Sequence, residues 1–103
     1  RYAAGQRDFR NLNLMAANLR NLNLRGVNLS GANLTKANLT RTNLSQANLT
    51  GAILVGANLT EANLSQANLI DANLSDANVV DTNFSHARMN KATTGNGMAS
   101  GAV

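Results

Sequence analysis

Side chains that could carry out chemistry are few in this chain, and they are spread along it. His86 is the only histidine and cysteine is absent, so the second group that a metal site or a Cys-His dyad requires is missing. Asp71, Asp76 and Asp81 recur at every fifth residue and are the one row of carboxylates that could serve in acid–base catalysis. Nine Asn-x-Ser/Thr triplets are too dense to be glycosylation signals. These residues predict no enzyme, no cofactor and no metal site.

Arginine residues are the strongest candidates for a binding site, and they gather near the N-terminus. The first fifty residues carry seven Lys or Arg against Asp8 alone, a net charge of +6, whereas the remaining residues carry −2. A collar of arginines in this half could bind an acidic protein, phosphate groups or anionic headgroups, or could serve solubility alone. The predicted collar consists of Arg7, Arg10, Arg20 and Arg25. With only three aromatic residues on which bases could stack, the chain is not expected to bind nucleic acid.

A five-residue period determines where all of these side chains lie. A large apolar residue, usually Leu, occupies every fifth position from Phe9 to Met89. Two positions earlier stands a small residue, usually Ala, and Leu12 and Leu22 are the bulky exceptions. Asn separates the two apolar positions, with three interruptions: Asp8, Ile53 and Arg88. The pattern predicts one repetitive domain with a narrow core of Leu and Ala.

Neither ordinary element can bury such a repeat on one side. On an α-helix each fifth residue is rotated by about 140° from the last, and on a flat strand successive fifth residues point to opposite faces. A closed coil that turns a corner once per pentad brings both apolar positions to a common axis. Glycine would support these corners, since it occurs four times directly before the small residue, at Gly26, Gly31, Gly51 and Gly56. We therefore expect a solenoid of short extended segments.

Three successive pentads carry a family resemblance. Residues 32–46 read Ala-Asn-Leu-Thr-Lys, Ala-Asn-Leu-Thr-Arg and Thr-Asn-Leu-Ser-Gln, and this run resembles the pentapeptide repeat proteins. The resemblance implies an all-β fold, a right-handed quadrilateral β-helix with four pentapeptides per coil, and about four coils for this chain. Residues twenty apart should then stack on one face. Two surface columns would bring opposite charges together: Arg41, Glu61 and Asp81 in one, Asp71 and Lys91 in the other.

The two ends of the chain depart from the repeat. We predict three segments: an N-terminal cap remnant at 1–6, the β-helix at 7–92, and a flexible tail or C-terminal cap at 93–103. Phe9 and Phe84 are the bulkiest inward residues and would plug the ends of the coil. Because the chain begins at Arg1 rather than Met, we expect a processed form or an excerpt of a longer protein. No apolar run approaches the ~18 residues of a membrane-spanning helix.

The dispersed reactive groups favour a non-enzymatic structural or protein-interaction module that presents flat β-helix faces. An exposed coil end would allow a homodimer. One alternative is a DNA mimic that interacts with gyrase, which the net charge of +4 and the short rod disfavour. Another is a module that binds an anionic partner through the basic N-terminal coil. Aliphatic residues at outward positions could mark a contact face: Met15, Ile53, Val55, Ile70 and Val80.

Overall fold

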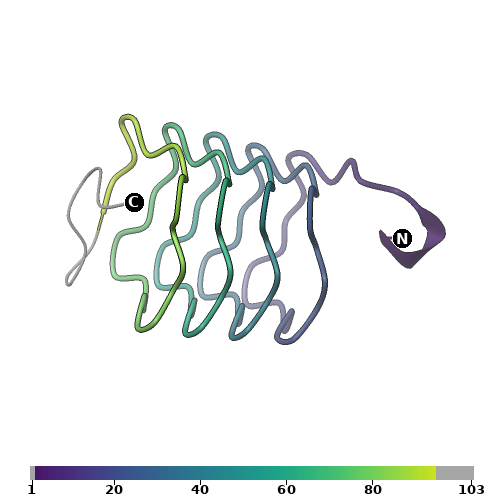
Figure 1. Ribbon diagram of the computed structural model, residues 1–103, viewed down its shortest axis with the longest axis horizontal. Coiled ribbons are helices and arrows are strands. Elements are labelled where there is room, and N and C mark those ends of the chain that lie inside the picture. The colour runs from purple at the N-terminus through teal and green to yellow at the C-terminus, as the bar shows by residue number, and fades with distance from the viewer. Residues whose placement is uncertain (1, 95–103) are drawn as a thin grey trace.

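The structure is a computed structural model that describes residues 2–94. η1, a short 3-10 helix at Tyr2–Ala4, is the one helix in this part of the chain. Beyond η1 the chain forms parallel β-bridges, each joining a residue to the one twenty positions later, as Asn38 to Asn58. The rungs lie side by side along one axis (Figure 1), and the molecule measures 36 × 23 × 22 Å. The chain is therefore a β-helix solenoid whose coil takes twenty residues.

Backbone hydrogen bonds join each coil to the next in both directions. The Leu39 N–H donates to the Asn58 C=O at 2.8 Å, and the Asn58 N–H donates to the Ala37 C=O at 2.9 Å. The bridges form four columns, which start in the first coil (residues 8–27) at Asp8, Asn13, Asn18 and Asn23. The coils satisfy one another's backbone groups, as the strands of a parallel sheet do.

A tight turn at the end of each pentad bends the chain around the coil. The N–H of the fourth turn residue donates to the C=O of the first, as from Ala57 to Leu54 at 3.0 Å. The third residue of every turn has a positive φ of 55–70°, from Ala16 to Lys91. A type II turn requires this conformation, which costs an L residue about 1–2 kcal/mol unless it is Gly. Most corners nevertheless carry a non-glycine residue, because the coil bonds over-determine the turn.

Gly51 offers a direct measure of this cost. Its φ is +66°, and a Cβ added there would meet nothing within 4 Å, so no steric clash confuses the result. We expect Gly51→Ala to lower the free energy of unfolding by about 1 kcal/mol, because the left-handed conformation disfavours a Cβ. Gly51→Asn should cost less, since Asn tolerates this conformation. Urea denaturation of the three proteins measures the difference, and an alanine variant as stable as the parent would contradict it.

Leu and Ala side chains fill the interior in columns that follow the coils. The large-residue position is 0–2% exposed from Leu29 to Leu74. The small-residue position is equally closed through the middle of the rod. Thr42 occupies one such position and donates its hydroxyl to the Leu19 C=O at 2.8 Å, so its polar atom is paired. The predicted inward positions are thereby confirmed for the central coils.

Burial falls off towards both ends of the described rod. Leu14 and Leu19 in the first coil are only half-buried, and so are Val79 and Phe84 near the other end. Leu22, which the repeat placed facing the axis, is 45% exposed. The reason is that a coil buries its inward side chains against its neighbours, and the first coil has a neighbour on one side within residues 2–94.

Candidate functional site

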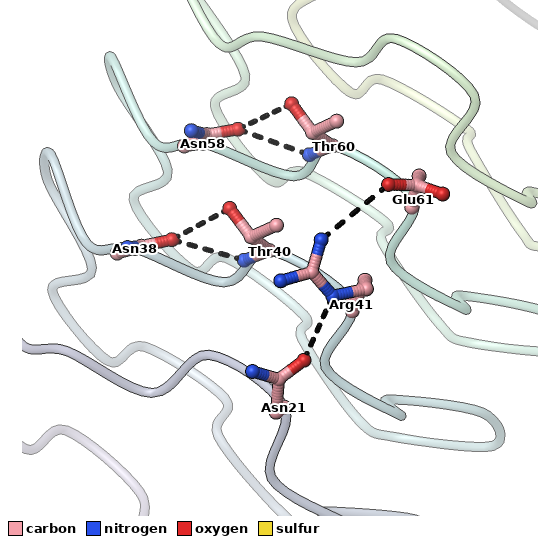
Figure 2. A network of polar contacts seen from close by, with 7 residues as sticks. All are labelled: Asn21, Asn38, Thr40, Arg41, Asn58, Thr60 and Glu61. Atoms are coloured by element: carbon pink, nitrogen blue, oxygen red, sulfur yellow. Dashed lines mark hydrogen bonds and ion pairs between the residues drawn. The ribbon is translucent and has the colours of Figure 1, made fainter.

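The outer faces of the rod carry a regular polar ladder. The Asn58 Oδ1 accepts the backbone N–H of Thr60 at 3.0 Å and the Thr60 hydroxyl at 2.6 Å, and the Asn38–Thr40 pair repeats this one coil earlier. Figure 2 shows the two pairs stacked. The Oδ1 atom of each of these asparagines is thus already paired within its own turn. The faces are flat and largely neutral surfaces of amide and hydroxyl groups.

Charged side chains lie at the corners of the coil, where they stack in columns. Arg41 donates through Nε to the Asn21 Oδ1 at 2.9 Å and lies 3.6 Å from the Glu61 carboxylate (Figure 2). The predicted Arg41–Glu61 contact is therefore present. The predicted Asp71–Lys91 neighbours form no ion pair in the described part of the chain. An exposed pair such as Arg41–Glu61 contributes at most ~1 kcal/mol.

The residues considered for catalysis do not converge. Asp71, Asp76, Asp81 and His86 occupy four successive corners of the rod, and all four are exposed. Within residues 2–94 there is no group of three His, Cys, Asp or Glu side chains that could hold a metal ion. The five-residue period separates these groups because each pentad ends on a different side of the coil.

Two of the four predicted collar arginines are held by the chain itself. The Arg7 guanidinium lies 3.7 Å from the centroid of the Tyr2 ring and donates to the Tyr2 C=O at 2.9 Å. Arg10 forms a bidentate pair with Asp8, with both N–O distances 2.9 Å. The hydrogen bond to Asp8 and its negative charge raise the pKa of the exposed Arg10. The contacts of Arg7 and Arg10 are thus local, and their guanidiniums are only partly available to a partner.

The other two collar residues, Arg20 and Arg25, leave their guanidiniums unpaired. Both are exposed, and neither side chain makes a hydrogen bond or ion pair with residues 2–94. Beside them the first coil opens into an apolar hollow of about 230 Å³. Its lining includes Phe9, Leu12, Leu14, Leu19 and Leu24. Phe9 therefore lines the hollow, and the predicted plug at this end is incomplete.

This hollow was not predicted, although the sequence contains a signal for it. The small-residue position is occupied by leucine only in the first coil, at Leu12 and Leu22, and Leu12 lines the hollow. A bulky residue fits there because no preceding coil closes the walls within residues 2–94. η1 borders this end, since the Tyr2 hydroxyl donates to the Arg25 C=O at 2.7 Å.

A small aliphatic patch interrupts the polar ladder. Ile53 replaces the usual asparagine and is 39% exposed, while Val55 is half-buried beside it. Met15 and Val80, also predicted to be outward, are 54% and 58% exposed. Gly51 and Gly56 stand at the two corners of this pentad, and the Lys36 side chain of the preceding coil lies close to Gly56. It is a second candidate contact surface, on a face rather than at an end.

No helix in residues 2–94 is both long enough and apolar enough to cross a membrane.

The model of one protein family matches the repeat. The sequence model described as pentapeptide repeats matches residues 13–51 and 52–90, in eight copies. No curated protein matches the chain.

Solved structures of pentapeptide repeat proteins are similar to it. HetL, involved in heterocyst differentiation regulation in the cyanobacterium Nostoc sp. strain PCC 7120, is 35% identical over 88% of this chain and 42% of HetL, with a TM-score of 0.83. Rfr23 from the cyanobacterium Cyanothece 51142 is 35% identical over 84% of this chain and 63% of Rfr23, with a TM-score of 0.49. A protein from the Arabidopsis thaliana thylakoid lumen is 33% identical over 78% of this chain and 59% of its own, with a TM-score of 0.50. The chain thus spans less than two thirds of each.

Proposed function

Because the chain belongs to the pentapeptide repeat family, we propose that it is a non-enzymatic structural or protein-interaction module that presents flat β-helix faces. The observation that carries the proposal is the separation of Asp71, Asp76, Asp81 and His86 onto successive corners, beside faces whose asparagine Oδ1 atoms are already paired within the chain. Such faces offer a partner shape and a regular array of hydroxyl and amide groups, with little to catalyse a reaction.

For the fold in finer detail, we propose a right-handed quadrilateral β-helix of about four coils. The twenty-residue bridges support it, as does the similarity to HetL. Residues 1–6 are proposed as an N-terminal cap remnant and 93–103 as a flexible tail or C-terminal cap, of which 95–103 lie outside the described residues. Thr93 still bridges to Asn73, so the ladder extends one residue beyond the predicted boundary at 92.

A photo-crosslinking experiment tests the interaction role. A benzoylphenylalanine residue is placed at one outward position on each side of a single coil: Thr50, Val55, Thr60 or Ser65. In an extract of the source organism we expect one or two adjacent faces to crosslink to one defined protein, and excess unlabelled chain should compete. Equal labelling from all four positions, or none, would sink the proposal, because a specific partner contacts a specific face.

The DNA-mimic alternative is tested separately. Duplex DNA carries one negative charge per about 1.7 Å, whereas this chain has a net charge of +4 and only five acidic residues. We therefore expect no inhibition of gyrase supercoiling by micromolar protein. Inhibition at that concentration would show that the charge argument is wrong and would make mimicry the better proposal.

A further inference from the structure

We propose that the N-terminal edge of the solenoid binds an acidic, pentad-like peptide segment of a partner protein, which adds to the first coil as one more rung. The inference rests on the proposed interaction role and adds a second contact, at the end of the rod rather than on its faces. Three features of the first coil meet at this edge: unpaired backbone amides, an apolar hollow and two unpaired arginines.

Unpaired backbone amides give the edge its periodicity. In the interior, the amide between the two inward positions donates to the residue 21 positions earlier, as Asn33 donates to the Leu12 C=O at 2.9 Å. The equivalent amides of Asn13, Asn18 and Asn23 have no such acceptor in residues 2–94. A sheet edge of this kind pairs with an added strand. Because the free amides recur every five residues, a segment with the same period fits them best.

The apolar hollow can accept the inward side chains of the added rung. Leu14 and Leu19 are half-buried, whereas their counterparts one coil later, Leu34 and Leu39, are fully buried. A pentad that brings one Leu and one Ala to the axis would cover them. The hollow of about 230 Å³ provides space for such side chains. Burying this surface would stabilise the complex at roughly 25 cal/mol per Å² of apolar area, before the cost of ordering the peptide.

The charge of the edge specifies an acidic segment. Arg20 occupies the outward column that continues through Thr40 and Thr60, one rung spacing of ~4.8 Å apart. An added pentad would place its own outward residue next to Arg20 in that column, and an acid there would pair with the unpaired guanidinium. Arg25 lies one column further on, beside η1, and adds its positive charge to this end of the edge. η1 is held at the Arg25 corner, so the open edge lies along Asn13 and Asn18.

A synthetic peptide tests the proposal directly. The probe is two acidic pentads, Ala-Asp-Leu-Asp-Gly-Ala-Asp-Leu-Asp-Gly, with Gly at the corners and Asp at the outward positions. The control replaces each Asp by Lys. We expect the acidic peptide to bind the full chain saturably by calorimetry and the Lys peptide not to bind. Hydrogen exchange should slow at the amides of Asn13 and Asn18, which pairing would protect, and not at the amides of the central coils.

Matched variants separate this site from general charge attraction. Arg20→Gln with Arg25→Gln should weaken binding about fivefold, as it removes one exposed ion pair, worth up to ~1 kcal/mol, and a second positive charge beside the segment. Lys36→Gln with Arg41→Gln removes the same charge one coil later and should change the affinity less than twofold. Leu12→Trp fills the hollow at a half-buried position and should abolish binding while the circular dichroism spectrum stays unchanged.

Several outcomes would overturn the proposal. Binding of the Lys peptide with equal affinity, or unchanged exchange of the Asn13 and Asn18 amides in the complex, would exclude an added rung. An equal loss of peptide affinity in both double variants would show that net charge alone accounts for the binding. A third outcome is that the chain is retained on anionic phospholipid vesicles, that Leu12→Trp leaves this retention unchanged, and that the peptide does not bind. In that case the arginines bind a lipid surface instead. Failure of peptide binding leaves face crosslinking unaffected, so the two proposals fail independently.

Discussion

Leu54→Ala is expected to lower the free energy of unfolding by about 3–5 kcal/mol, enough to unfold a marginally stable domain. Leu54 is fully buried in the middle of the rod, where coils on both sides hold the surrounding walls in place. The backbone bonds between coils prevent these walls from collapsing into the space that the missing atoms leave. The cost therefore includes a cavity term in addition to the lost burial.

Leu14→Ala is the matched control, because Leu14 lies in the same column two coils earlier. It is only half-buried, and the first coil already borders a hollow, so the variant should cost about 1–2 kcal/mol. Urea denaturation of the parent and the two variants, followed by circular dichroism, gives the comparison. Equal costs at the two positions would contradict the burial gradient from end to centre.

The central coils could be predicted from the sequence because each pentad there meets the same neighbours. The five-residue spacing identified the inward positions, and these are buried from Leu29 to Leu74. The four pentads per coil that the family resemblance implied placed Arg41 beside Glu61, as observed. The length of the coil, together with the five-residue period, thus determines contacts between residues that are distant in the chain.

The ends could not be predicted in the same way, because there the repeat no longer supplies the neighbours. Arg7 appeared equivalent to Arg20 in the sequence, yet it stacks on Tyr2 while Arg20 is unpaired. The pairing of Arg10 with Asp8 depends on a single departure from asparagine in the ladder. Contacts of this kind follow from individual residues rather than from the period. The local contacts of Arg7 and Arg10 thus reduce the candidate binding site from four arginines to two, Arg20 and Arg25.

The backbone conformation of the corner residues is a second feature that the sequence alone could not predict. Four glycines indicated unusual backbone angles at one position of the pentad, but Lys36, Gln46 and Glu61 share the same positive φ. Side-chain type alone would have excluded a left-handed conformation for them. The hydrogen bonds on either side impose it, since the turn and the neighbouring coils leave no other path for the chain. Here the tertiary structure overrides the local preference.

Overpacking of the narrow core should have the second large effect. Ala52 is fully buried at the small-residue position, in the same column as Leu12 of the first coil. We expect Ala52→Leu to lower the free energy of unfolding by about 2–3 kcal/mol, because three added carbons must displace walls that the bonds between coils hold together. The native Leu12 escapes this cost only because it borders the hollow.

Ala17→Leu makes the same change in the first coil and serves as the control. Ala17 is half-buried, so the longer side chain can extend towards the open end, and the variant should stay within about 0.5 kcal/mol of the parent. Denaturation midpoints in urea, with the slopes checked for constancy, measure both variants. If Ala52→Leu proved as harmless as Ala17→Leu, the solenoid could widen locally without loss. The small residue in each pentad would then reflect a preference of the turn rather than the limited width of the core.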